Sequence, residues 1–227
     1  MKIRSKWSII LLMSIAALSS DICFAADDFQ WWNSANIVAD LSEKWTFTFE
    51  EQLRMGNDAG TLIRHHSDFG AVYHGLADWL DLGINYRSIE TKTFDGDWNH
   101  RDRIHANFTF LGKIFGRGIS NRLRFEYDTG QRIKDFGTFR NKITINPPFE
   151  FHPHREIFKS YTIKPYWAYE LFYSTLNDKI ARHRYTAGLS YKLSENWSSK
   201  IYYMYEENTS SKARDLNILG LQIKFIF

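Results

Sequence analysis

Cysteine and proline are scarce in this sequence, and long apolar runs are missing from most of it. The single cysteine, Cys23, lies near the N-terminus, and there are four prolines in 227 residues. Beyond residue 25 no stretch approaches the eighteen or so uninterrupted apolar residues that a membrane helix needs. These absences exclude a disulfide scaffold and a helical membrane protein. If the chain enters a membrane, it must do so as a closed β-barrel.

The charge is also nearly balanced, with 29 basic and 26 acidic residues. A nucleic-acid-binding domain would show a large basic excess, so the sequence argues against that class. It contains no glycine-rich loop that would cradle a phosphate and no spaced Cys/His set. We therefore expect no cofactor, no metal site and no nucleic-acid partner.

The N-terminal 25 residues have the pattern of a secretory signal peptide. Basic residues come first, residues 8–18 are mostly apolar, and Cys23-Phe24-Ala25 offers small residues around a cut before Ala26. The apolar run is too short to span a bilayer, although a short anchor is the alternative. The sequence thus predicts a signal peptide at 1–25 and one exported domain at 26–227.

The rest of the chain alternates between apolar and polar residues with a period of two. In WTFTFEEQLRM, residues 45–55, the aromatic and aliphatic side chains fall on one face, and Glu51 is the one charge on that face. The same alternation recurs at 104–110, 122–128, 139–145 and 219–227. This periodicity predicts an all-β chain with strands of about ten residues.

Short and long connections alternate along the chain, as they do in an antiparallel up-and-down transmembrane β-barrel. Near-identical turns, LSEKW and LSENW, each place a tryptophan at a strand start, where membrane-interface tryptophans are found. The strands are expected near 29–38, 45–55, 64–74, 79–90, 101–111, 119–128, 138–151, 161–173, 182–193, 197–207 and 216–227. Because bacterial barrels have even strand numbers, we expect about 10–12 strands, with residues 29–38 partly inside the lumen or on an irregular edge.

Periodicity alone does not say which face points inward. In a soluble, periplasmic lipocalin-like barrel the apolar face would enclose a ligand, whereas in an outer-membrane barrel it would face lipid. Long, numerous strands and paired arginines on the polar face favour the membrane barrel. Phe225 and Phe227 on the last strand resemble the signal by which bacterial outer-membrane proteins are recognised for insertion. We therefore predict the outer membrane of a Gram-negative bacterium, with the barrel-assembly machinery as a partner during insertion.

An ordered series of segments, WTFTFEEQLR, HSDFGAVY, LGINYR, RLRFEY, FRNKITI, YELFY, GLSYKLSENW and ILGLQIKF, resembles the bacterial family called domain of unknown function twenty-four-ninety. The resemblance extends over nearly all of the mature chain. It implies an exported, outer-membrane-type barrel and brings no established activity. The long 146–160 connection, with Pro147, Pro148 and Pro153, departs from the family pattern.

With the apolar face toward lipid, the polar face lines the lumen and is rich in arginine. One hypothesis is a plugged barrel in which these charges pair across strands. The other is a narrow pore for anionic solutes, because rings of arginine or lysine select for negative charge. Outer-membrane lipid and the phosphates of lipopolysaccharide are the expected partners. The predicted lumen-lining residues are Arg54, Arg87, Arg101, Arg103, Arg122, Arg124, Glu126, Arg140, Lys142, Glu170, Arg184 and Lys224.

Catalysis has weaker support in the sequence. His65 and Ser67 share the lipid-facing side of one strand, and His66 and Asp68 share the lumen side. A Ser-His pair facing lipid would suit an acyl hydrolase that acts on membrane lipid. Two histidines in the HPH turn, His152 and His154, are more typical of a solvated turn than of a metal site. The sequence alone therefore predicts a barrel without enzymatic activity, with the hydrolase as the alternative.

Overall fold

The computed structural model describes residues 28–93, 95–114, 117–130, 134–148, 162–210 and 213–227. The predicted signal peptide lies outside these ranges. No helix in the described ranges has the length and apolar character needed to cross a bilayer. The elements are eleven strands, β1 (Asp28–Asp40), β2 (Trp45–Gly56), β3 (Thr61–Ala77), β4 (Leu80–Lys92), β5 (Trp98–Ile114), β6 (Arg117–Gly130), β7 (Phe136–Asn146), β8 (Thr162–Ser174), β9 (Lys179–Lys192), β10 (Trp197–Asn208) and β11 (Leu216–Ile226).

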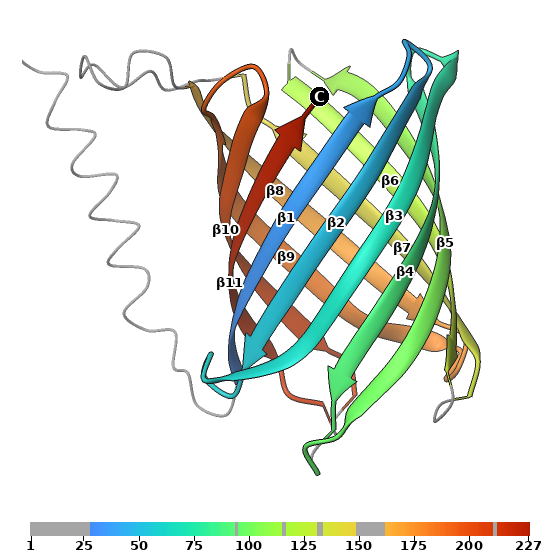
Figure 1. The fold of residues 1–227 in the computed structure, drawn as a ribbon, viewed down its shortest axis with the longest axis vertical. Helices are drawn as coiled ribbons and strands as arrows, with labels where there is room; N and C mark the ends of the chain where they lie inside the picture. The colour runs from blue at the N-terminus through green and yellow to red at the C-terminus, as the bar shows by residue number, and fades with distance from the viewer. Residues whose placement is uncertain (1–27, 94, 115–116, 131–133, 149–161, 211–212) are drawn as a thin grey trace, which may run out of the picture.

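The eleven strands close into one barrel, and the all-β prediction is confirmed. Neighbouring strands are antiparallel everywhere except at the closing seam, where β1 runs parallel to β11. Trp31 pairs with Leu219 and Ile37 with Phe225 in this register. Figure 1 shows both strands running in the same direction.

The seam corrects two expectations from the sequence. Residues 29–38 do not lie in the lumen or on an irregular edge, since β1 is bonded along its length to β2 and to β11. The barrel is also not antiparallel throughout, because strands that alternate in direction meet in parallel when their number is odd. The predicted strand at 138–151 is shorter than expected, since β7 ends at Asn146.

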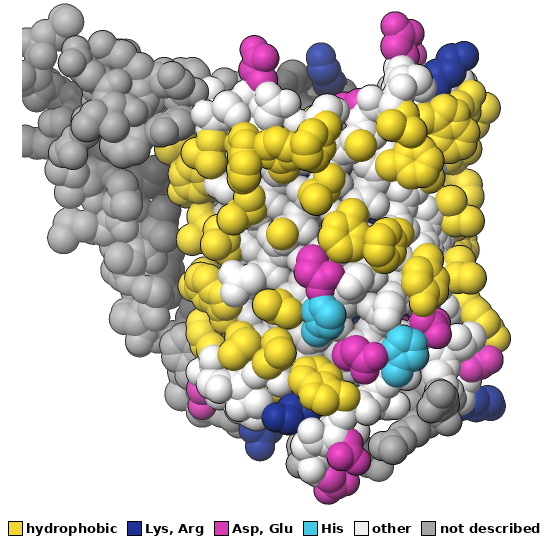
Figure 2. All heavy atoms as spheres, viewed as in Figure 1, with side chains coloured by type: hydrophobic (Ala, Val, Ile, Leu, Met, Phe, Trp, Pro, Cys, Tyr) yellow, Lys and Arg dark blue, Asp and Glu magenta, His cyan; other side chains and the backbone are white. Residues whose placement is uncertain are grey.

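The apolar face of the strands points outward. Exposed side chains include Phe47, Phe69, Ile84, Ile104 and Phe125, whereas the buried set of the described residues contains five arginines, five carboxylates and two histidines. Figure 2 shows hydrophobic side chains spread over the outer surface. The lipocalin-like alternative, with an apolar interior, is therefore wrong.

Two near-identical turns build part of an aromatic girdle at the end of the barrel where β1 ends and β2 begins, whose connections are short apart from 147–161. In each turn a serine hydroxyl, of Ser42 or Ser194, accepts a hydrogen bond from the backbone N–H of the tryptophan that opens the next strand. Trp45 then packs on Tyr73 with ring centroids 4.9 Å apart, and Trp197 on Phe225 at 4.7 Å. Both tryptophans are nearly half exposed, as interface tryptophans are.

A tight layer of aromatic rings over glycines shapes part of the interior. The ring of Tyr202 on β10 lies over Gly220 on β11, and a β-carbon at Gly220 would come within 2.0 Å of a ring atom. The ring of Tyr166 similarly covers Gly188, where a β-carbon would also lie 2.8 Å from the backbone oxygen of Ile201. Glycine is required at these positions because two neighbouring strands must accept a large ring between them.

We expect Gly220→Ala to destabilise the barrel by about 1–3 kcal/mol, because overpacking forces the ring of Tyr202 to move. The measurement is the urea midpoint of tryptophan fluorescence for detergent-folded protein. Gly112→Ala is the control, since its nearest neighbour, Ile119, would lie at an ordinary 3.5 Å. Equal midpoints for the two variants would contradict this account of the glycine.

Candidate functional site

A group of polar and ionisable side chains interrupts the apolar outer wall. Glu51 is the charge that breaks the alternation of β2, and the register of β2 and β3 places it directly opposite Ser67. The next outward-facing pair, two residues further along β2, is Leu53 opposite His65. Figure 2 shows acidic and histidine side chains gathered on this face, with hydrophobic side chains on both sides of them.

Glu51 links the serine and the histidine. The hydroxyl of Ser67 donates to Oε2 of Glu51 at 2.6 Å, and Nε2 of His65 contacts Oε1 of the same carboxylate. The side chains of His65 and Glu51 are 40% and 33% exposed, so a molecule at the wall would reach them. The order is serine, carboxylate, histidine, in which the carboxylate and not the imidazole contacts the hydroxyl.

The polar group continues on the next two strands. His100 of β5 contacts Glu90 of β4 through Nδ1 at 2.7 Å and Asp102 through Nε2 at 3.2 Å. The register places Glu90 opposite both His65 and His100. We call the six residues that join four strands the wall cluster: Glu51, His65, Ser67, Glu90, His100 and Asp102.

Such a cluster is costly on a surface that faces lipid. Charged side chains on the lipid face of a barrel destabilise it by up to several kcal/mol near the bilayer midplane and by less near the interfaces. Ionisable groups at membrane depth are rare and usually mark a function. The wall cluster is therefore more typical of a functional site than of the lipid-facing surface of a barrel.

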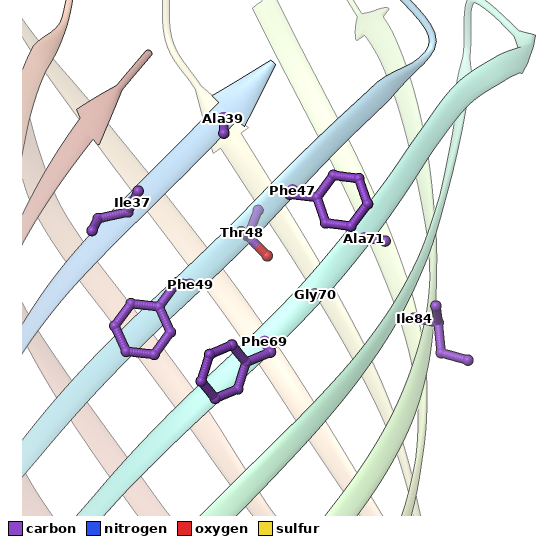
Figure 3. A pocket seen from close by; sticks show the side chains of 9 residues that line it. All are labelled: Ile37, Ala39, Phe47, Thr48, Phe49, Phe69, Gly70, Ala71 and Ile84. Atoms are coloured by element: carbon purple, nitrogen blue, oxygen red, sulfur yellow. The ribbon is translucent and has the colours of Figure 1, made fainter. Parts of the chain in front are cut away.

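An apolar groove lies beside the wall cluster, toward the end of the barrel with the shorter connections. Figure 3 shows its lining, in which Ala39, Gly70 and Ala71 leave room between larger apolar side chains on β1 to β4. Its volume is about 420 Å³. The ring pair Phe49 and Phe69, with centroids 4.8 Å apart, belongs to the lining. The next outward pair of residues is Glu51 and Ser67, about 7 Å further along the strands.

The lumen holds the second concentration of charge. A cavity of about 740 Å³ runs inside the barrel, and all the predicted lumen residues except Glu126 and Lys224 line it. Glu126 is buried just behind the cavity wall. Lys224 follows Gln222, which lines the cavity, on the same side of β11.

Ion pairs line the inner face of the barrel and mostly join neighbouring strands. Glu126 contacts Arg103 at 2.7 Å, Arg140 at 2.5 Å and Arg124 at 3.5 Å. Arg140 also reaches Glu170 at 2.8 Å. Other pairs join Arg87 to Asp68, Arg103 to Asp128 and Arg184 to Glu206. These contacts are the pairing that buried charges require.

The other residues singled out in the sequence lie outside the wall cluster. Phe225 packs between Trp197 and Phe227 in the aromatic girdle. His66 and Asp68 are buried on the lumen side, opposite in direction to His65 and Ser67. His152 and His154 lie outside the described residues. Within the described residues, no group of three His, Cys, Asp or Glu side chains is arranged to hold a metal ion.

Sequence reasoning marked Glu51 as misplaced but did not connect it with Ser67, and it passed over Glu90, His100 and Asp102. The missing information was the register between strands, which decides which outward residues become neighbours. One signal was available in the sequence, since each of these residues breaks the apolar alternation of its own strand.

A closed barrel with an apolar outside and a charged interior belongs to the class of outer-membrane-type β-barrels. The chain belongs to the family described as protein of unknown function (DUF2490), whose model matches residues 29–217, and the predicted family is confirmed. No curated protein matches the chain. Among solved structures, LpxR from Salmonella typhimurium is similar, with a TM-score of 0.53 and 8% identity over 85% of this chain and 87% of that one.

This structural neighbour corrects one prediction. LpxR is an outer-membrane enzyme, so this barrel fold is compatible with catalysis, and the expectation of a barrel without enzymatic activity is overturned. At 8% identity the likeness shows the fold alone. The question of an activity therefore rests on the residues of this chain.

We expect Glu126→Gln to destabilise the barrel by about 3–5 kcal/mol, because three buried arginines lose a common carboxylate. Urea unfolding of the detergent-folded protein measures this. Glu43→Gln, in the exposed 41–44 turn, makes the same change where it should shift stability by no more than about 0.5 kcal/mol. If the two variants unfolded at the same urea concentration, the network would not contribute as described.

Proposed function

We propose that the protein is an outer-membrane acyl hydrolase whose active site is the wall cluster, with membrane lipid as the substrate. The observation that carries this proposal is the hydrogen bond from Ser67 to Glu51, with His65 on the other carboxylate oxygen. A nucleophile in hydrogen-bond contact with a base, and a third group that orients the base, is the general pattern of covalent catalysis.

In the proposed reaction the hydroxyl oxygen of Ser67 attacks the carbonyl carbon of a lipid ester, and its proton passes to Glu51. The ester C–O bond then breaks, and the leaving alcohol takes the proton from Glu51. The acyl group remains on Ser67. Water, deprotonated by Glu51, attacks this acyl-serine, and the fatty acid leaves as the serine hydroxyl is restored.

His65 acts through Glu51 as a positioning residue. It holds one carboxylate oxygen while the other faces Ser67. Without this contact Glu51 would be free to turn toward other partners on the wall. The imidazole thus orients the base, as the third member of a triad does.

The apolar groove fits the acyl part of such a substrate. A lipid chain lying along the wall would fill the space over Ala39 and Ala71, and its ester would reach Glu51 and Ser67 just beyond Phe49 and Phe69. Because the chain of a membrane lipid is already in hydrocarbon, the groove would hold it by van der Waals packing and would keep the ester near the hydroxyl.

Two further points support an outer-membrane lipid. In bacterial barrels the longer loops are extracellular, and, the 147–161 connection apart, the longer connections lie at the end toward which the wall cluster is placed; this supports a position in the outer leaflet. LpxR, which shares the fold, is a lipid A deacylase. For this chain, lipopolysaccharide and phospholipid are both candidate substrates.

We expect Ser67→Ala to abolish release of fatty acid and Glu51→Gln to lower the rate by about 10²–10⁴-fold, the usual contribution of a general base. The measurement is free fatty acid, determined by mass spectrometry, after purified barrel is mixed with lipopolysaccharide or phospholipid in detergent micelles. Ser88→Ala is the matched control, because Ser88 lies directly opposite Ser67 in register. Wild-type protein that releases no fatty acid from either lipid would sink the hydrolase, as would full activity in Ser67→Ala.

Filling the groove should separate binding from chemistry. We expect Ala71→Trp to raise KM at least about tenfold for a long-chain ester, because the indole occupies the space of the acyl chain, while hydrolysis of a butyrate ester is unchanged. Ala187→Trp is the control, since Ala187 lies on β9, away from the groove. Equal effects on long and short esters would show that the groove does not bind the chain.

A further inference from the structure

The lumen has a large surplus of positive charge. Thirteen arginine and lysine side chains line its cavity, and only two carboxylates, Glu50 and Glu170, line it with them. Asp68, Glu126, Asp128 and Glu206 pair with some of these arginines from behind the lining. Lys164 apart, six carboxylates of the described residues are set against twelve of these cations, so positive charge exceeds negative charge in the lining and directly behind it.

Two arginines on one side of the cavity show the surplus most clearly. Arg54 and Arg64 face each other across β2 and β3 in the strand register. Arg54 lies over the ring of Trp32 at 3.6 Å and donates to the amide oxygen of Gln52. The Nε of Arg64 is buried and has no hydrogen-bond partner in the part of the chain that the structure describes. Neither guanidinium forms an ion pair with a described carboxylate.

Such an arrangement is unfavourable unless an anion occupies it. Half-buried guanidinium groups that face one another across a narrow cavity repel one another, because the surrounding protein screens their charges less than bulk water does. A guanidinium group can donate two parallel, short, charge-assisted hydrogen bonds to the oxygens of one phosphate. The volume of about 740 Å³ is within the range of small-molecule sites.

We infer that the lumen is a binding site for a multiply charged anion of the phosphate class, with Arg54 and Arg64 among its ligands. This site is separate from the proposed active site, because Arg54 and Arg64 point inward whereas the wall cluster points outward. The bound anion neutralises the surplus and stabilises the closed barrel. The inference does not depend on any lipid hydrolysis.

Thermal unfolding of the full barrel in detergent tests the site, with inorganic pyrophosphate as the probe and sodium chloride at equal ionic strength as the reference. We expect pyrophosphate to raise the unfolding temperature in a saturable way, as a ligand of the folded state does. For Arg64→Gln we expect the Kd of pyrophosphate to rise at least about tenfold, the loss expected from a charge-assisted hydrogen bond. Lys44→Gln, in the exposed 41–44 turn, removes the same charge and should bind as the wild type does.

The stability of Arg64→Gln without added anion gives a second, independent test. If Arg64 is a surplus charge, removing it should leave the unfolding temperature unchanged or higher, whereas loss of a structural ion pair would lower it. A titration with lipopolysaccharide micelles asks whether the phosphate belongs to a lipid headgroup or to a soluble anion. Stabilisation by pyrophosphate no greater than by chloride, or an unchanged Kd in Arg64→Gln, would overturn the site, and so would a lowered unfolding temperature of that variant without anion.

Discussion

The parallel seam between β1 and β11 is the constraint on which the rest of this barrel depends. A sheet that faces lipid must satisfy every backbone N–H and C=O group within the protein, so its two edge strands have to meet. With eleven strands they run in the same direction when they meet, and register at the seam places Trp31 beside Leu219 and Ile37 beside Phe225. Backbone bonds at both ends hold this arrangement, from Asp28 N–H to Asp215 C=O and from Phe227 N–H to Val38 C=O.

Closure also fixes which strands are neighbours at the seam, and this explains what the sequence could and could not predict. Alternation along a single strand is a local property, so the outward Phe47 and Phe49 and the inward arginines were predictable from residue order alone. The seam was not, because the general rule of even strand numbers argued against β1 as an ordinary strand. The strand at residues 29–38 was correctly located in the sequence, but its parallel pairing with β11 was not predicted.

The wall cluster illustrates the same limit at the level of a site. Glu51 and Ser67 are sixteen residues apart in the sequence, and each by itself is only an exception in an apolar pattern. Their contact depends on the pairing of β2 with β3, in which a shift by one residue would turn every side chain of one strand to the opposite face. Strand lengths alone would not have given this register, because irregularities between Arg54 and Met55 and between Tyr73 and Ala77 shift the pairing that brings Glu51, Ser67 and Asp102 into one row.

The two charged regions are coupled because they share a wall only one strand thick. On β2, Glu50 points into the lumen and Glu51, its neighbour, points out to the wall cluster. The surplus of positive charge inside therefore lies close behind the outward carboxylates, and its field favours negative charge on the wall. This attraction offsets part of the cost of placing Glu51, Glu90 and Asp102 on an apolar surface. A barrel with a neutral lumen would lack that compensation, so the arginine-rich interior and the acidic wall cluster are best understood as parts of one electrostatic design.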